Sequence, residues 1–187
     1  MTRWQMARKH ATDSPLLLGN QLCFAIYSTA HAFNRVYKAL LDKLGLTYPQ
    51  YLVMLVLWER DGEPVKNIGE RLFLDSGTLT PLLKRLEAAG LLKRTRSTED
   101  ERQVLIALTP QGQALREKAR AVPQAILAAS ACSVTELSAI KNELVALRDR
   151  LNAALGESGG GGEAREALSI ASSIRSASWQ RRDRSGI

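Results

Sequence analysis

Apolar residues recur at three- and four-residue steps in the first quarter of the chain, a spacing typical of a helix with one buried face. This pattern covers residues 16–44 and stops at Gly45, a residue suited to the left-handed conformation that closes helices. Thr47 and Gln50 then have the spacing of a capping box. The helix that they open carries apolar residues on nearly every side at 51–58, so we expect it at the centre of the core.

The middle of the chain changes from helical to strand periodicity. Apolar residues stay at helical spacing up to Gly90, and beyond it they alternate with polar ones, which is typical of half-buried strands. The predicted order is a break at 61–64, a short helix at about 65–74, a break at 75–77, a helix ending at Gly90, and strands at 91–96 and 103–108 joined by a charged turn at 97–102.

Helical periodicity returns after the second strand. Thr109 and Pro110 predict the start of a helix at 111–130, and Ser133, with Glu136 three residues later, predicts a capped helix at 134–155. The expected fold class is mainly α with a small β-hairpin. The expected organisation is a flexible N-terminus at 1–14, one domain at 15–155, and a flexible tail at 156–187 that is rich in Gly, Ser and Ala.

Composition narrows the function classes. The 187 residues include 26 Lys and Arg against 19 Asp and Glu, and a net charge of +7 favours a polyanionic partner such as nucleic acid. Two cysteines are too few for a disulfide framework, and no CxxC pair is present for zinc, so we expect no metal and no cofactor. Polar residues interrupt the apolar stretch at 16–34, which predicts no membrane span and a cytoplasmic protein.

Helix, short helix, helix and two-stranded hairpin is the element order of a winged helix-turn-helix. If the leucines of the helix that ends at Gly90 face inward, small hydroxyl and basic side chains are left for phosphates and base edges. Cations on the hairpin would suit a narrow minor groove. The predicted DNA-binding residues are Ser76, Thr78, Thr80, Pro81, Lys84, Arg85, Arg94, Arg96, Asp100 and Arg102. Pro81 is awkward inside a helix, so the helix either starts late or is distorted there.

Residues 74–94 (LDSGTLTPLLKRLEAAGLLKR) and 100–109 (DERQVLIALT) resemble the MarR family of transcriptional regulators. The resemblance covers about 15–155 and implies that Asp100 orients Arg102 towards the minor groove. It also implies a homodimer with interlocking terminal helices, at about 15–45 and 111–155. The two winged helix parts of such a dimer, at about 46–109, would bind a palindromic operator in double-stranded DNA.

The segment LGNQLCFAIY (18–27), with Tyr37 and Tyr48, resembles the organic hydroperoxide resistance regulators, whose sensor is a cysteine on the first helix. Cys23 occupies that position. Tyr37 lies 14 residues further on, about 21 Å along a straight helix, so it could meet Cys23 only from a second subunit. Tyr27, at i+4, can touch Cys23 within its own chain.

The expected chemistry follows from the thiol. Peroxides oxidise the thiolate, which phenol hydroxyls would stabilise, and an apolar wall that includes Phe24 would favour organic peroxides. The sulfenic acid that forms can condense with a second thiol. Resemblance to a two-cysteine subgroup implies that this thiol is Cys132 of the other subunit, and that oxidation releases the operator and derepresses a peroxide-detoxification gene.

Two other function classes stay open. A MarR-type repressor could release DNA on binding a small phenolic or aromatic ligand, with Cys23 incidental, since a cysteine on an apolar face often serves as a small core residue. A thiol peroxidase could use the same two cysteines. The hairpin argues against such an enzyme, as does the distance in sequence from Cys23 to the nearest following arginine, Arg35.

Overall fold

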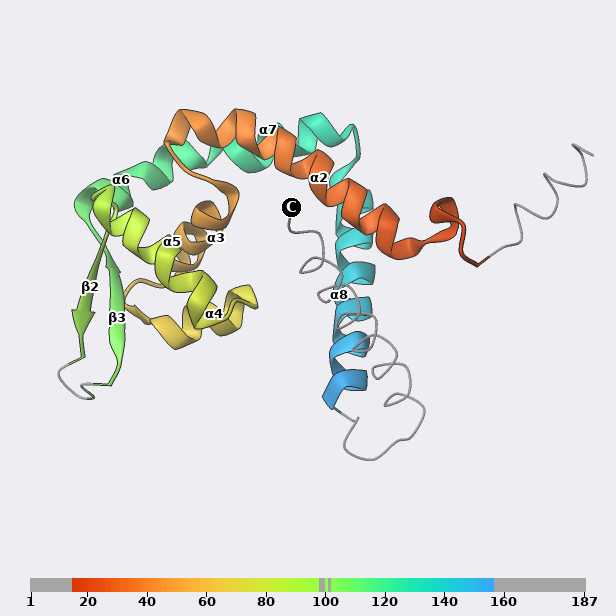
Figure 1. Ribbon diagram of the computed structural model, residues 1–187. Coiled ribbons are helices and arrows are strands. Elements are labelled where there is room, and N and C mark those ends of the chain that lie inside the picture. Colours follow the sequence, from red (N-terminus) through yellow and green to blue (C-terminus); the bar gives the residue numbers. More distant parts are fainter. Residues whose placement is uncertain (1–14, 98–99, 101, 157–187) are drawn as a thin grey trace, which may run out of the picture. The chain divides into compact units, whose positions relative to one another are not determined.

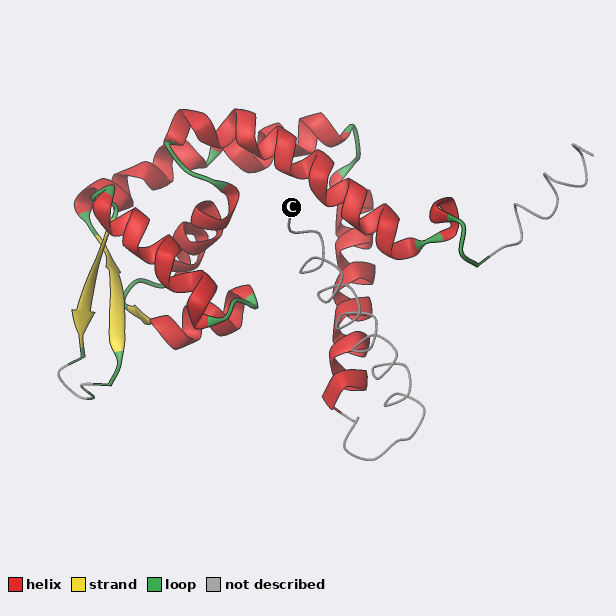
Figure 2. Cartoon of the chain, in the orientation of Figure 1, coloured by secondary structure: helices red, strands yellow, loops and turns green. Residues whose placement is uncertain are grey.

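The computed structural model describes residues 15–97, 100 and 102–156, and it confirms a mainly helical fold with a small antiparallel sheet (Figures 1 and 2). The chain divides into two compact units between Ala131 and Cys132. In the first unit the helical segments are η1 (Leu18–Asn20), α2 (Leu22–Leu41), η2 (Asp42–Leu44), α3 (Tyr48–Glu59), α4 (Val65–Leu72), α5 (Ser76–Ala88), α6 (Pro110–Ala119) and α7 (Ala121–Ser130). Its strands are β1 (Glu63–Pro64), β2 (Leu92–Arg96) and β3 (Val104–Leu108), and the second unit contains α8 (Val134–Gly156).

The signals that end the first long helix and start the next are confirmed. Gly45 adopts a left-handed conformation, with φ of 68°. Thr47 donates its backbone N–H to the side-chain oxygen of Gln50 at 2.8 Å, closing the capping box. The predicted helix at 16–44 is in fact η1, α2 and η2 in succession, because tighter 3-10 turns occupy both of its ends.

The sheet has one strand more than the sequence predicted. Its order is β1-β3-β2, with both neighbours antiparallel to β3. The short β1 lies in the segment that was predicted as a break, and its Glu63 pairs with Ile106. Asp61 reinforces this pairing because its side chain accepts the backbone N–H of Leu108 at 2.8 Å. A two-residue strand has too little length to show an alternating pattern, so periodicity could not reveal it.

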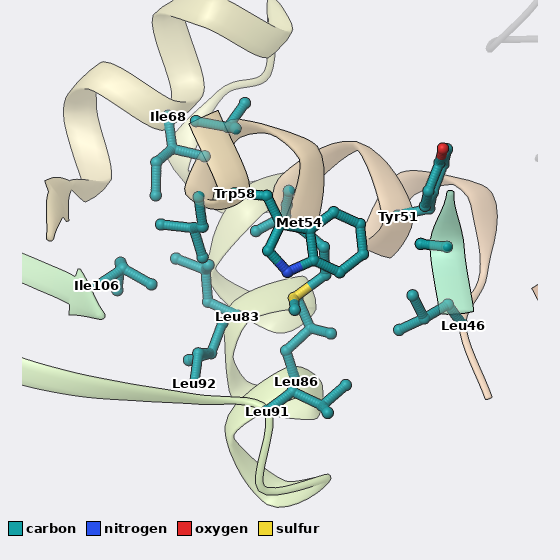
Figure 3. Packing of buried hydrophobic residues seen from close by; sticks show 14 of the residues in the cluster. Leu46, Tyr51, Met54, Trp58, Ile68, Leu83, Leu86, Leu91, Leu92 and Ile106 are labelled. Carbon is teal, nitrogen blue, oxygen red and sulfur yellow. The ribbon is translucent and has the colours of Figure 1, made fainter. Parts of the chain in front are cut away.

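The core of the first unit lies between α3, α5 and the sheet (Figure 3). As predicted, α3 is central, with Tyr51, Val53, Met54, Val56, Leu57 and Trp58 all buried. Trp58 donates its indole N–H to the backbone oxygen of Gly112 at 3.0 Å, so its polar atom is satisfied inside the core. This bond ties α3 to the start of α6, directly after the hairpin.

Two details of the later helices differ from the prediction. The expected helix at 111–130 is interrupted at Arg120, so it forms α6 and α7, and α7 packs along α2 (Figure 1). The start of α6 is fixed by Thr109, whose side-chain oxygen accepts the N–H of Gly112 at 3.0 Å. Pro81 lies inside α5, which begins at Ser76 and so does not start late.

The second unit is described by α8. Ser133 caps this helix as predicted, because its hydroxyl accepts the N–H of Glu136 at 3.2 Å and its own N–H donates to the Glu136 carboxylate at 2.7 Å. The predicted flexible N-terminus at 1–14 lies outside the described residues, and so does the predicted tail at 156–187 apart from Gly156, which is the last residue of α8. Within the described part of the chain, every helix is too short or too polar to cross a membrane.

Candidate DNA interface and candidate sensor cysteine

The helix α5 has one buried and one exposed face. Leu79, Leu83 and Leu86 are buried against the core, as the spacing predicted. Asp75 caps the helix by accepting the backbone N–H of Thr78 at 2.8 Å, and the hydrogen bonds from Thr78 hold the pKa of the Asp75 carboxyl below its usual value. The predicted residue Thr78 therefore also belongs to the helix cap.

Most of the predicted DNA-binding residues are exposed. The exposed ones are Ser76, Thr78, Pro81, Lys84, Arg85, Arg96 and Arg102, and the partly buried ones are Thr80, Arg94 and Asp100. Lys84 and Arg85 lie in the second half of α5, so this helix presents two adjacent cations on its solvent side. Such an arrangement can contact phosphates and the acceptor edges of bases.

Asp100 acts on the backbone of the hairpin turn. One of its carboxylate oxygens accepts the backbone N–H of Arg102 at 3.0 Å, and the other accepts the side-chain amide of Gln103 at 3.0 Å. Asp100 therefore fixes the chain direction at Arg102 through a backbone hydrogen bond. The remaining turn residues 98, 99 and 101 lie outside the described residues.

Arg94 has a partner that sequence reasoning missed. Glu87, near the end of α5, accepts the backbone N–H of Arg94 at 3.0 Å, and the other oxygen of Glu87 lies 3.8 Å from the Arg94 guanidinium. From the sequence alone, Glu87 is predicted to be an ordinary solvent-facing helix residue. A carboxylate one short turn before a strand of basic residues was the available signal for this contact.

Cys23 is exposed near the N-terminal end of α2. Its neighbours Phe24, Ile26 and Tyr27 are also exposed, by 39%, 40% and 61%, although all three are apolar or aromatic. Tyr27 packs its ring edge-on against His31, with centroids 4.3 Å apart. The single chain therefore leaves the surroundings of the thiol open, and another surface would have to cover them to make a closed pocket.

Tyr37 and Tyr48 are brought together at the junction of α2 and α3. Their ring centroids lie 4.4 Å apart, and both line a groove of about 840 Å³ together with Phe33. Burial raises the pKa of Tyr37 to about 12, with further contributions from Tyr48 and Tyr51, and burial also raises the pKa of Tyr48. Both phenols therefore keep their protons at neutral pH and can act as hydrogen-bond donors.

The structure does not bring Cys23 to this tyrosine pair within one chain. Both Cys23 and Tyr37 belong to the continuous helix α2, so 14 residues separate them by about 21 Å along its axis. Cys132 belongs to the second unit, where it precedes α8 and is partly buried. In the described part of the chain, no group of three or more His, Cys, Asp or Glu side chains could hold a metal ion.

Comparison with known proteins identifies the family. Residues 35–119 match the model of the transcriptional regulator SarA/Rot family. The organic hydroperoxide resistance transcriptional regulator of Bacillus subtilis is 52% identical over 135 residues, which are 72% of this chain and 92% of that protein. The regulator TtmR of Methylorubrum extorquens is 53% identical over 144 residues, which are 77% of this chain and 74% of TtmR. This chain belongs to the MarR/SarA family of winged helix-turn-helix regulators.

Solved structures of similar proteins share this fold. Reduced AbfR bound to DNA is 41% identical, with a TM-score of 0.58. The match covers 72% of this chain and 94% of the AbfR chain. A disulfide-formed AbfR is 39% identical, with a TM-score of 0.52, and the match covers 78% of this chain and 98% of that AbfR chain. The relatives of this MarR/SarA protein are transcriptional regulators, which confirms the prediction of a regulator rather than an enzyme. The roles of individual site residues stay predictions.

Proposed function

We propose that this chain is a homodimeric, DNA-binding repressor that senses organic hydroperoxides through Cys23. Oxidised Cys23 then forms a disulfide with Cys132 of the second subunit, and the operator is released. The observation that carries the proposal is the 52% identity to the Bacillus subtilis regulator over 92% of that protein, combined with an exposed cysteine on an apolar helix face.

DNA binding is supported by α5 and the hairpin. The exposed cations Lys84 and Arg85 lie on the solvent side of α5, and Arg96 and Arg102 lie on the hairpin. Reduced AbfR, which is 41% identical, was solved bound to DNA. In the proposed complex α5 enters the major groove and the hairpin reaches the adjacent minor groove, as winged helix proteins use these two elements.

A homodimer is supported by apolar surface that one chain leaves uncovered. In the first unit, the exposed apolar side chains near the start of the chain are Leu16, Leu18, Leu22, Phe24, Ile26, Tyr27 and Phe33. In the second unit, α8 exposes Val134, Ile140, Leu144, Val145, Leu151 and Leu155. Patches of this kind mark interaction sites in soluble proteins, and a second copy of the chain would cover them.

The dimer would also complete the sensor pocket. Tyr37 and Tyr48 of one subunit would approach Cys23 of the other, because the continuous α2 helix keeps Cys23 and Tyr37 of one chain apart. Both phenols stay protonated at neutral pH, so they can donate hydrogen bonds to a thiolate and favour it over the thiol. Phe24 and Phe33 would supply apolar surface for the organic group of the peroxide.

The chemistry has two steps. The Cys23 thiolate attacks one peroxide oxygen, the O–O bond breaks, and with one proton the products are a sulfenic acid and an alcohol. The thiol of Cys132 then attacks the sulfenic sulfur, and a disulfide and one water are formed. The first step reduces the peroxide by two electrons and oxidises the sulfur. The second step links two subunits and would change the spacing of their α5 helices.

The experiment measures DNA release by fluorescence anisotropy, with a duplex that the reduced protein selects from a random-sequence library. Cumene hydroperoxide should release the wild-type protein, and Cys23→Ser should stay bound. Cys132→Ser serves as the matched control that retains the first oxidation step. Release of Cys23→Ser by the hydroperoxide would contradict the proposal.

A second candidate function is supported by the groove at Tyr37 and Tyr48. Its volume of about 840 Å³ and its lining of Phe33 and two phenols would suit a small aromatic ligand. Cumyl alcohol has the same ring as cumene hydroperoxide but cannot oxidise a thiol. Equal release of DNA from wild type and Cys23→Ser by cumyl alcohol would favour a ligand-binding repressor.

A further inference from the structure

A crevice of about 530 Å³ separates α5 from the hairpin and the start of α4. Three basic side chains line it: Lys66 from α4, Arg94 from β2 and Arg102 from the hairpin turn. Thr80 of α5 and Asn67 of α4 add neutral hydrogen-bonding groups, and the described lining residues include no carboxylate. The crevice is therefore a cationic site built from three elements that are distant in sequence.

Arg94 is held in this crevice by Glu87. The strand β2 is at the sheet edge, and its register with β3 turns the N–H of Arg94 away from β3, towards α5. Glu87 accepts this N–H at 3.0 Å. The contact joins the free edge of the hairpin to α5 and fixes the strand at the residue whose side chain lines the crevice.

The pairing of the Arg94 side chain is incomplete. The Glu87 carboxylate lies 3.8 Å from the guanidinium, which is beyond hydrogen-bond distance, and the Nε of Arg94 is buried without an acceptor among the described residues. An unsatisfied buried donor on a charged group is unfavourable. The side chain of Arg94 as a whole is 28% exposed, so its terminal N–H groups can donate to an anion that enters the crevice.

We propose that the crevice binds a phosphate of the DNA strand that passes between α5 and the hairpin, with Lys66 and Arg94 as its ligands and Glu87 as the positioning residue. This inference rests on the proposed DNA-binding function. If α5 occupies the major groove and the hairpin the adjacent minor groove, a sugar-phosphate strand must cross the space between them, because that strand separates the two grooves. The crevice occupies that space and carries the charge to receive a phosphate.

The test measures affinity for the selected duplex and for a random-sequence duplex over a series of salt concentrations. Loss of one phosphate contact reduces the magnitude of the slope of log K against log salt by about 0.9. Each of Lys66→Gln and Arg94→Gln removes one of the two cations at the phosphate, so in a dimer either variant should reduce that magnitude by up to about 1.8. Affinity should fall on the order of tenfold for both duplexes alike. Lys118→Gln, which removes an exposed cation on α6 outside the crevice, should leave the slope close to that of the wild type.

Glu87→Ala separates positioning from simple charge. Removing a carboxylate near DNA should strengthen binding if charge alone mattered, whereas loss of the Arg94 contact should weaken it. In an Arg94→Gln background, Glu87→Ala should then have little further effect, as a double-mutant cycle would show. Additive effects of the two substitutions would overturn the positioning role.

Two further results would overturn the proposed phosphate site. Slopes unchanged in Lys66→Gln and Arg94→Gln, or weakening confined to the selected duplex, would overturn the phosphate site. These results leave the proposed function intact, because the wild-type protein still binds DNA. Failure of the reduced wild type to select any duplex would overturn the proposed function and this inference together.

Discussion

The rings of Tyr37 and Tyr48 lie with their centroids 4.4 Å apart, where α2 ends and α3 begins. Both side chains are partly buried, and the ring centroid of Tyr51 lies 6.2 Å from that of Tyr37. The two phenols thus share one apolar environment in the groove that we assign to the sensor pocket. Their proximity has consequences for pH dependence that can be measured without any peroxide.

Stability should fall at alkaline pH because of this cluster. The pKa of Tyr37 is raised from 10.0 to about 12 in the folded chain, so the unfolded chain loses its proton first as pH rises. The stabilisation is complete below pH 10 and is lost as pH rises towards 12. Because the ring is only half buried, screening by water limits the loss to about 1 kcal/mol. Denaturant unfolding at a series of pH values measures it. Tyr37→Phe should flatten the curve, and the more exposed Tyr27→Phe should not.

Gly112 should tolerate no side chain. A Cβ at this position would lie 1.9 Å from the backbone oxygen of Leu91, an overlap that the backbone of the hairpin base would have to relieve. Gly112→Ala should therefore destabilise the protein by about 3 kcal/mol or more, measured by denaturant unfolding. Gly19→Ala is the matched control, since a Cβ there meets no atom within 4 Å. Equal stability of the two variants would contradict the packing of Trp58, Gly112 and Leu91.

Replacing Ala131 with glycine should stabilise the protein. It adopts a left-handed conformation with φ of 51° at the end of α7, which costs an alanine about 1 kcal/mol. Ala131→Gly should therefore raise the free energy of unfolding by about 0.5–1 kcal/mol. Ala129→Gly, inside the last turn of α7, should lower it by a similar amount. Destabilisation by both substitutions would contradict the assigned end of the helix.

Local signals predicted the helix boundaries best. The capping boxes at Thr47 and Ser133 and the left-handed Gly45 act within a few residues, so the sequence reveals them directly. The strand β1 escaped prediction because its two residues are held by pairing with β3, more than 40 residues later. Phe73 also adopts a left-handed conformation, with φ of 55°, which residue preference alone would not assign to an aromatic residue.

In the candidate site, too, local features could be predicted from the sequence, whereas contacts between elements could not. The sequence proposed Cys23 and the two tyrosines as candidate site residues, and helix geometry already separated Cys23 from Tyr37 in one chain. The close contact of Tyr37 with Tyr48 depends on how α2 turns into α3. The contact of Glu87 with Arg94 depends on the register of β2 with β3, so it needed the structure.

Oxidation by peroxide should link Cys23 of one subunit to Cys132 of the other. A mixed dimer of one Cys23→Ser subunit and one Cys132→Ser subunit, purified through two different tags, retains one Cys23 and one Cys132 on opposite chains. After one equivalent of cumene hydroperoxide, a non-reducing denaturing gel should show this mixed dimer as a covalent species that dithiothreitol reverses. Each variant homodimer should stay monomeric on the same gel. A mixed dimer that stays monomeric, with wild type cross-linked or not, would contradict the intersubunit disulfide.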